Sequence, residues 1–566
     1  MKGYISSGLD NCTVKKDIMK LLSDKFTAWK RLQLASNHLD LLKDMPSNFN
    51  IIIMQHSPDK RTLYCGILDK PKSSTSTTDG KSKGKDKQTS SQTDTSRAAV
   101  YKIHVDPEKY NEMMDQHSDF QQRLMSFLLQ SEYQRSQLAM RQKMLQQLSK
   151  SATVISISET ALEEQAMEEM KEEFGDILND MEKYVEPLSS HIKTKLLQPI
   201  IEQANQHTFL KRDFQQELSN GQLLSELTPE MIIILAGPTL MQLPLEALKC
   251  LQTPHVDSVT RDFSLQMLHR RWFVDPEEAA AAAEKKRNDL KTAPKTPKGG
   301  KDAGKKGVAT PAAKIVPLNR ELPPDCASID THSFHYIVDP SNECSETEQY
   351  RPAQVFQQLL QMYGQTFTPR WNGLFGTEVF PSVGQWEEMI NNCSAFIFYG
   401  MERFIAQLPP AKVAALNLDE CQLALLIDKS QTNKSFRHQS KVDVDKTNTL
   451  LSIEKPLQTA MLLSLSGANC VCLNQWHTTS ESNAAKLHTF MECVLEQGLT
   501  VGQAIRKITN PTLKKPEPVV EEVAPITPVM NEDEAFEEDK ESEIVTQLDA
   551  SWCNMVVFGL PNLVVT

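Results

Sequence analysis

Two short polar segments, each following an apolar run typical of a buried strand, carry residue types that could do chemistry. Gly400–Arg403 follows the run Phe396–Tyr399, and Asp428–Ser430 follows the run Leu423–Ile427. Ligands of open α/β sheets bind outside the carboxyl ends of the strands, so a catalytic pair would be expected in these two turns. Lys429 could act as a nucleophile there if its pKa were strongly lowered.

The simpler interpretation of Lys429 is a solvated charge, or a salt bridge to Glu402 or Asp428. Cys421 lies at the start of its predicted strand, which is the wrong end of the sheet for a nucleophile. Because free cysteines are among the most buried residues, we expect a structural thiol at that position.

The remaining candidates for catalysis or metal binding have no supporting pattern. His335, His438 and His477 share no spacing, and we interpret each as a surface or satisfied core residue. The chain has no CxxC pair, no Cys/His spacing suited to zinc, and no complete GxGxxG or GxxxxGK[ST] phosphate motif. No metal site and no cofactor site are therefore predicted.

The composition argues against several classes of protein. The 566 residues carry 61 Lys and Arg against 73 Asp and Glu, a formal net charge of −12, which does not suit a general nucleic-acid binder. No run of about 18 apolar residues predicts a membrane span, and the start of the chain lacks the apolar core of a secretory signal. The eleven cysteines are scattered and odd in number, so reduced thiols and a cytoplasmic location are expected.

Shifts in composition divide the chain into four parts. Two α/β regions are separated by a low-complexity linker and preceded by a helical segment, and each α/β region holds a polar insertion. The predicted boundaries are 1–47 for the helical segment, 48–276 for the first region with a disordered insertion at 71–97, 277–314 for the linker, and 315–566 for the second region with an acidic, Pro-rich insertion at 511–546.

Apolar runs and helical periodicity alternate along both regions. The predicted strands cover 49–68 as a hairpin, 98–105, 231–235, 335–338, 395–399, 423–427, 470–473 and 553–558. The predicted helices cover 107–150, 159–206, 352–363, 385–392, 456–466 and 481–497, with another beginning at 243–248. This alternation predicts an α/β fold with a mostly parallel sheet that helices cover on both faces.

The order of these elements resembles the caspase-like fold of the CHAT and separase peptidases. The segments that carry the resemblance are Met231–Leu248, Val338–Pro340 with Glu348, Trp371–Leu374, Leu463–Trp476, Gly498 with the helix at Ala504, and Trp552–Gly559. Their shared order extends over residues 50–566. The resemblance implies a caspase-like α/β domain of the CHAT or separase type, preceded by a short helical segment.

In that family one strand ends in a Gly-His-Gly turn that presents the catalytic histidine, and the next core strand presents the catalytic cysteine. Position by position, the histidine falls on Met401 and the cysteine on Lys429. A thioether takes up no proton at neutral pH, and an ammonium ion is no nucleophile. Bulky Glu402 and Arg403 also stand where small residues would let a substrate backbone approach. The resemblance therefore implies a degenerate dyad and no catalytic residue.

Three segments are similar to the large cilia- and flagella-associated proteins that carry tetratricopeptide arrays. These segments are Trp371–Gly376, Phe396–Phe404 and Cys472–Leu487. Those proteins lie in the central apparatus of motile axonemes, so the resemblance implies the C-terminal part of a structural protein of a central-pair projection. It implies a location in the cytoskeleton of the cilium and a non-catalytic scaffold role in ciliary motility. The implied partners are other central-apparatus proteins, with microtubules as a further candidate, and neither nucleic acid nor a membrane.

Two alternatives stay open. The chain could be an active cysteine peptidase of the separase type with a His/Cys pair at other positions, which labelling by a thiol-directed activity probe would reveal. It could also be a regulatory pseudo-peptidase domain outside cilia, which abundance in non-ciliated cells would support.

Overall fold

The computed structural model describes residues 38–46, 48–68, 98–148, 157–206, 230–253, 256–273, 322–323, 325–344, 348–510 and 550–566. Most of the predicted N-terminal helical segment lies outside these described residues. The predicted insertion at 71–97, the linker at 277–314 and the acidic insertion at 511–546 also lie outside them.

In the described part of the chain, eleven strands form one sheet in the order β3-β2-β1-β4-β5-β12-β11-β10-β9-β7-β8. The strands are β1 (Phe49–His56), β2 (Thr62–Leu68), β3 (Ala98–His104), β4 (Glu230–Ala236), β5 (Val256–Arg261), β7 (Phe334–Val338), β8 (Asn372–Phe375), β9 (Ala395–Tyr399), β10 (Leu423–Ile427), β11 (Cys470–Asn474) and β12 (Met555–Gly559). Neighbouring strands are parallel except at β1–β2, β2–β3 and β11–β12. A separate two-stranded sheet pairs β6 (Ala327–Ile329) with β13 (Leu563–Val565).

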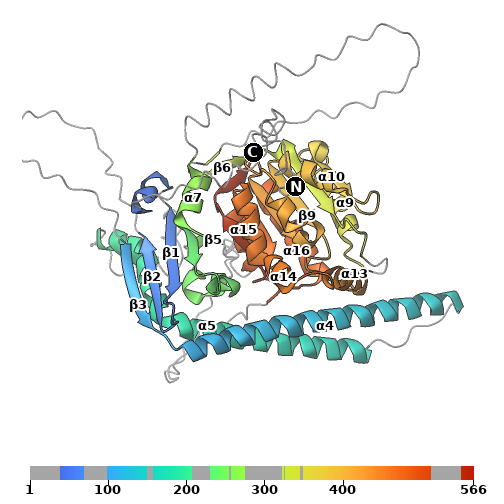
Figure 1. The fold of residues 1–566 in the computed structure, drawn as a ribbon, viewed down its shortest axis with the longest axis horizontal. Helices are drawn as coiled ribbons and strands as arrows, with labels where there is room; N and C mark the ends of the chain where they lie inside the picture. Colours follow the sequence, from blue (N-terminus) through green and yellow to red (C-terminus); the bar gives the residue numbers. More distant parts are fainter. Residues whose placement is uncertain are drawn as a thin grey trace, which may run out of the picture.

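Helices cover both faces of the large sheet (Figure 1). The α-helices are α4 (Pro107–Leu148), α5 (Ile157–Gln206), α7 (Leu265–Trp272), α9 (Pro352–Met362), α10 (Val383–Asn391), α11 (Phe404–Gln407), α12 (Pro410–Val413), α13 (Asn433–Asp443), α14 (Asn448–Ile453), α15 (Pro456–Ser466), α16 (Ser480–Met491) and α17 (Val501–Thr509). Helices α5, α10 and α15 pack on one face, and α7, α9, α16 and α17 pack on the other. The predicted α/β fold with a mostly parallel, doubly covered sheet is confirmed.

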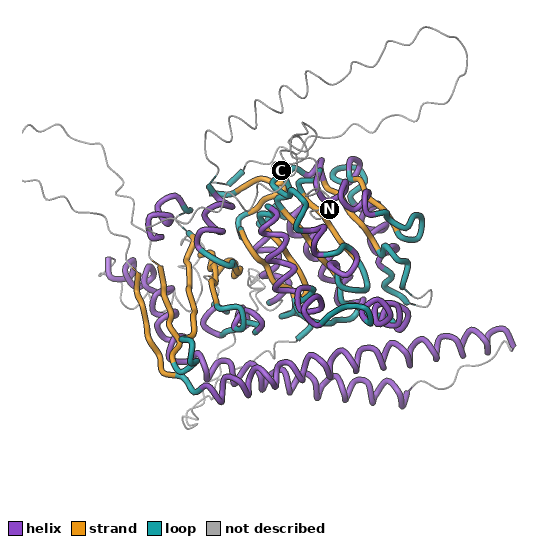
Figure 2. The backbone as a smooth tube through the Cα atoms, viewed as in Figure 1, coloured by secondary structure: helices purple, strands orange, loops and turns teal. Residues whose placement is uncertain are grey.

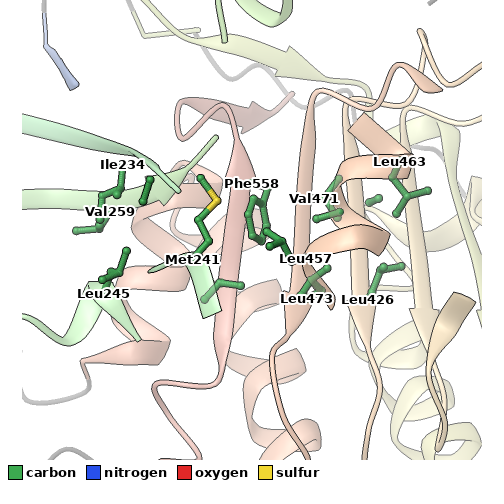
Figure 3. Close-up of a cluster of buried hydrophobic side chains, with 14 of the residues drawn as sticks. Ile234, Met241, Leu245, Val259, Leu426, Leu457, Leu463, Val471, Leu473 and Phe558 are labelled. Carbon is green, nitrogen blue, oxygen red and sulfur yellow. The ribbon is translucent and has the colours of Figure 1, made fainter. Parts of the chain in front are cut away.

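The central strands form because they are apolar along their whole length. Every residue of β9 and β10 is buried, and successive side chains point into opposite cores. Phe396 and Phe398 pack with α10 on one face, whereas Ile397 and Tyr399 join the core on the other. A strand covered on both faces needs no polar alternation, which is why these runs were recognisable in the sequence. Figure 3 shows one of the cores running from Ile234 on β4 past Phe558 to Leu426 on β10.

The two regions of the chain build a single sheet, and β12 joins them. β12 lies between β5 of the first region and β11 of the second, although it is the last strand of this sheet along the sequence. The β5–β12 pairing consists of one register pair, Arg261 with Phe558. Arg261 is fully buried at this junction, where its guanidinium donates to both carboxylate oxygens of Glu246 and to the Leu243 backbone oxygen, 2.8 Å away. The same guanidinium reaches across the junction to Gln475 Oε1 at 3.4 Å.

The helix predicted to begin at 243–248 is wrong. Residues 240–251 form three short 3₁₀ turns, η3 (Leu240–Gln242), η4 (Leu245–Ala247) and η5 (Lys249–Leu251). Pro244 cannot donate a helical hydrogen bond, and Leu248 takes an extended conformation with ψ 129°, so no α-helix extends through this segment. The structure also contains four strands that the sequence analysis missed, β5, β6, β8 and β13.

The helices α4 and α5 form a long antiparallel hairpin that crosses beneath the sheet (Figures 1 and 2). Phe120 of α4 and Phe174 of α5 pack with Trp476, which follows β11. Farther along α4, the Glu132 carboxylate accepts a hydrogen bond of 3.1 Å from the backbone N–H of Asn433, at the start of α13. The hairpin is therefore tied to the edge of the sheet where parallel strands β10 and β11 end.

Within the described residues, every helix is too short or too polar to cross a bilayer.

Candidate functional site

The two polar turns singled out in the sequence lie side by side. Strands β7, β9 and β10 are parallel and in register, with Val338, Tyr399 and Ile427 as their last paired residues. The backbone N–H of Gly400 donates to the Ile427 oxygen at 3.0 Å, and the N–H of Asp339 donates to the Tyr399 oxygen at 2.7 Å. The turns that follow these strands therefore meet at one carboxyl edge, which is where the sequence predicted a site.

The two positions that the sequence analysis assigned to a degenerate dyad are both buried. Met401 is 2% exposed and Lys429 is 7% exposed. The Lys429 ammonium donates to the backbone oxygen of Gln475 at 2.6 Å. The expectation of a solvated charge is wrong, and no ion pair joins Lys429 to Glu402 or Asp428 among the described residues. The reason is the turn after β11, which supplies a carbonyl acceptor that sequence spacing does not reveal.

Burial lowers the pKa of Lys429 to about 8, because desolvation outweighs the attraction of Asp428, and the charge of Arg403 lowers it further. The backbone at Lys429 has φ +60°, an uncommon conformation for a residue with a side chain. An amine with this pKa is partly neutral at physiological pH. Its hydrogen bond and its burial nevertheless hold it inside the protein, away from any solute.

Asp428 is held by the turns on either side of it. Its Oδ2 accepts a hydrogen bond of 3.1 Å from the backbone N–H of Phe404, and its backbone oxygen accepts from the amides of Asn474 and Asn483 at 2.8 Å and 2.9 Å. Its Oδ1 is buried without a hydrogen-bond partner among the described residues. Burial raises the pKa of Asp428 to about 6, although the Lys429 charge acts in the opposite direction.

Glu402 is the third buried ionisable group of the edge. Its side chain is 2% exposed, its Oε2 accepts from Gln431 Nε2 at 2.8 Å, and its Oε1 has no partner among the described residues. Burial raises the pKa of Glu402 to about 7, against the hydrogen bonds from Gln431 and Ser435. The next residue, Arg403, is satisfied instead by ion pairs of 2.9 Å and 2.8 Å to Asp443 and Glu454.

The three histidines and Cys421 named in the sequence analysis lie at separate places in the fold. His335 lies within 2.9 Å of the Met389 backbone oxygen, through Nδ1, as expected for a satisfied residue. His438 pairs with Glu343. His477 is partly buried at the carboxyl edge, where desolvation and then the charges of Lys429 and Arg403 lower its pKa to about 3. Cys421 is buried at the amino end of β10, and its thiol donates to the Leu423 oxygen at 3.4 Å.

The sequence analysis missed one thiol at this edge, Cys344 in the turn after β7. Its backbone N–H donates to Asp339 Oδ2 at 3.2 Å. Burial, followed by the negative charges of Asp339 and Glu348, raises the pKa of Cys344 well above its usual range. No hydrogen bond in the described part of the chain joins a thiol to an imidazole. Only its place in the sequence could have indicated this thiol, because Cys344 comes soon after Asp339 and Pro340, which directly follow β7.

A cavity of about 230 Å³ lies between α4 and the carboxyl edge. Helix α4 contributes Glu132 and Arg135, whereas the turns after β10 and β11 contribute Ser430 and Thr478. The hydroxyls of Ser430 and Thr478 are buried without partners among the described residues. A second space of about 10 Å³ touches Asp428 and Lys429, which is roughly the room that one water needs.

The arrangement offers buried proton-titrating groups and no thiolate. Glu402, Asp428 and Lys429 could each exchange a proton near neutral pH, but none is more than 7% exposed. No group of three or more His, Cys, Asp and Glu side chains within the described ranges could hold a metal ion. The edge is thus a network of desolvated charges beneath α4.

Comparisons with known proteins give weak similarities to parts of longer chains. No protein family profile matches. The chain is 25% identical over 300 residues to the Cilia- and flagella-associated protein 46 of Chlamydomonas reinhardtii, a match that covers 50% of this chain and 10% of that protein. Two crystal structures of the Saccharomyces cerevisiae separase–securin complex are similar in fold. The first match has a TM-score of 0.48 and 12% sequence identity, and it covers 97% of this chain and 33% of the solved chain. The second has a TM-score of 0.47 and 11% sequence identity, and it covers 93% of this chain and 30% of the solved chain.

Proposed function

We propose that this chain is a non-catalytic structural part of the motile cilium and that it acts by binding other axonemal proteins. The observation that carries the proposal is the chemistry of the carboxyl edge, where the turns after β9 and β10 present a buried thioether and a buried ammonium ion. The similarity to Cilia- and flagella-associated protein 46 supports the ciliary location.

The case against catalysis rests on protonation and access. A cysteine nucleophile reacts as a thiolate, and the acids around Cys344 together with its burial favour the protonated thiol. Lys429 is bonded to a carbonyl and sealed beneath the turns. Helix α4 lies across the same edge and is fixed there by Glu132 and by the packing of Phe120 against its neighbours. A substrate backbone would have to displace this helix to reach either group.

The finer proposal is a role in the central apparatus, as the C-terminal part of a protein with a tetratricopeptide array. The long doubly covered sheet supplies a stiff body, and the projecting hairpin of α4 and α5 enlarges its surface (Figure 1). Other central-apparatus proteins are the proposed partners, with microtubules as a further candidate. Such a protein would support ciliary beating mechanically, without turnover of a substrate.

The test is genetic complementation in ciliated cells. The endogenous protein carries a fluorescent tag for localisation, and cells that lack it are scored for beat frequency and for central-pair projections in electron micrographs. We expect the tag along the axoneme and loss of normal beating in the deletion. Wild type and Cys344→Ser should rescue equally, because neither relies on a thiol. A tag that stays outside cilia, or a Cys344→Ser protein that fails to rescue although it is equally abundant, would overturn the proposal.

An active cysteine peptidase remains the competing function, and the presence of Cys344 at the carboxyl edge is the observation that favours it. A thiol-directed activity probe applied to the purified chain decides between them. A peptidase would show labelling of Cys344 and peptide cleavage that both disappear in Cys344→Ala. Our proposal expects no cleavage, and labelling no faster than that of an unfolded cysteine peptide.

A further inference from the structure

Helix α13 carries a stripe of positive side chains at the surface, beside α4 (Figure 1). Lys434, Arg437, His438 and Lys441 follow one another at intervals of three or four residues, so they lie on the same side of the helix. All four residues are exposed. The whole chain has a formal net charge of −12, so this cationic stripe is a local exception to the charge of the protein.

The opposite side of α13 attaches the helix to the body through polar contacts. Ser435 is fully buried and Gln439 is 5% exposed. Gln439 Nε2 donates to Asp443 Oδ1 at 2.7 Å, and the Asp443 carboxylate forms ion pairs of 2.9 Å and 3.0 Å with Arg403 and Lys446. The single acid in the sequence of this helix is thus already paired, and it does not neutralise the stripe.

The fold uses two of the four positive side chains. Lys434 Nζ donates to the Asn342 backbone oxygen, and His438 pairs with Glu343. Lys434 nevertheless lies in the first turn of α13, where the helix macrodipole disfavours a positive charge. Helix stability therefore does not account for a cation at this position.

The other two, Arg437 and Lys441, are available to a partner. Neither forms an ion pair or a side-chain hydrogen bond within the described ranges, and none joins Lys441 to Asp445, an exposed acid one turn farther along. Val442 and Val444, which follow in the sequence, are 39% and 80% exposed. Apolar side chains with a charged rim are the usual arrangement of a surface that a protein partner covers.

The shape and surroundings of the stripe favour a polypeptide over other acidic partners. It extends about 10 Å along one convex helix, so it can lie against a segment with acidic side chains at similar intervals. A nucleic acid would meet the negative charge of the rest of the chain, and the aromatic ring of this helix, Phe436, is partly buried and poorly placed for stacking on bases. A bilayer surface would need a broad apolar side, whereas the buried side of α13 contains Ser435 and Gln439.

We propose that the exposed stripe of α13 binds an acidic segment of a partner protein. Arg437 and Lys441 pair with carboxylates of that segment, and Val442 and Val444 contact an apolar side chain next to them. Because these charges are exposed, the binding weakens as salt is added. The inference goes beyond the proposed function and does not depend on the ciliary role, because it concerns the chemistry of one surface of this chain.

Binding of a synthetic acidic peptide to the purified full chain tests the proposal. The probe is a fluorescein-labelled peptide of glutamates interspersed with leucines, followed by fluorescence anisotropy at low salt. Arg437→Glu combined with Lys441→Glu should weaken binding at least about tenfold, because two attractions become repulsions. The melting temperature should stay close to that of the wild type, since neither side chain has a partner in the described structure. A photo-crosslinking form of the peptide should label residues 433–443.

The matched control is Lys171→Glu combined with Lys183→Glu, which changes the net charge by the same amount at two lysines of α5. It should bind the peptide as the wild type does. Equal weakening by both double variants would show that only net charge matters and would overturn the proposal. A wild type that does not bind, or crosslinks that lie outside α13, would overturn it as well. An oligonucleotide, an anionic vesicle or a second copy of the chain that binds more tightly, and that the α13 variant loses, would assign the stripe to that partner instead.

Discussion

Glu402→Gln should make the protein more stable above neutral pH while changing little in mild acid. Burial raises the pKa of Glu402 from its ordinary 4.5 to about 7. The folded chain therefore keeps a proton on this carboxyl over a pH range in which the unfolded chain has already lost it. By linkage, the free energy of unfolding falls as pH rises through that range, and the loss is complete above the folded pKa.

The expected size follows from the interval between the two pKa values. Each pH unit in the interval corresponds to 1.36 kcal/mol, so Glu402 costs the wild type up to about 3 kcal/mol at pH 8. Glutamine has no charge to desolvate. Its amide oxygen can accept from Gln431, and its NH₂ group takes the place of the unpartnered Oε1. We therefore expect the variant to gain between about 1 and 3 kcal/mol at pH 8 and almost nothing at pH 5.

Urea unfolding of both proteins at several pH values between 5 and 8, followed by tryptophan fluorescence, measures this difference. Trp386 and Trp476 are buried and should report the loss of the core. Asp428 contributes a similar decline at lower pH in both proteins, so only the difference between the curves is diagnostic. The exposed control Glu387→Gln should give a curve parallel to the wild type. Parallel curves for Glu402→Gln, or a variant that is less stable at pH 8, would refute a desolvated carboxyl at this position.

Three further predictions concern the junction of the sheet, a close contact and the buried amine. Glu246→Gln should cost about 3–5 kcal/mol in urea unfolding, because it leaves the buried guanidinium of Arg261 without its countercharge; a loss below about 0.5 kcal/mol, the range of a surface change, would contradict this role. Gly376→Ala should cost about 3 kcal/mol, because the added Cβ would lie 1.8 Å from the Asp339 backbone oxygen; an unchanged thermal midpoint would argue against that contact. The wild type should gain stability as pH rises from about 8 to 10.5, since the folded chain has then lost the Lys429 proton that the unfolded chain still holds. Lys429→Met should abolish this gain, and an identical pH profile in the variant would disprove it.

The parts of the fold that the sequence predicted share one property, burial on both sides. β9 and β10 were assigned with their observed bounds because runs such as Ala395–Tyr399 contain no polar residue. β5 was missed because its sequence, Val256–Arg261, is largely polar. One of its polar side chains has a partner far away in the chain, since Gln503 donates to Asp257 at 2.6 Å. No local sequence pattern predicts a partner so far away in the chain.

The sequence predicted that the turns after β9 and β10 would meet, but not how their side chains are arranged. The place of the site follows from a general rule about parallel strands, and the two turns do meet at one edge. The burial of Lys429 depends on a carbonyl of Gln475, 46 positions later in the chain. The edge is covered by α4, whose sequence predicts a helix but not the surface on which that helix packs. Cys344 and His477 join the edge only once β7 and β11 are placed in the sheet.

Because β12 comes last along the sequence and lies in the middle of the sheet, the sheet can be completed only after β12 has been synthesised. As the chain emerges during synthesis, β5 and β11 each present an unpaired side until residues 555–559 arrive to fill the gap between them. Until then, two half-sheets with bare main-chain donors and acceptors coexist in the same nascent chain, a state prone to mispairing with other chains. A chain that ends shortly before Met555 would therefore lack β12, and we expect it to aggregate.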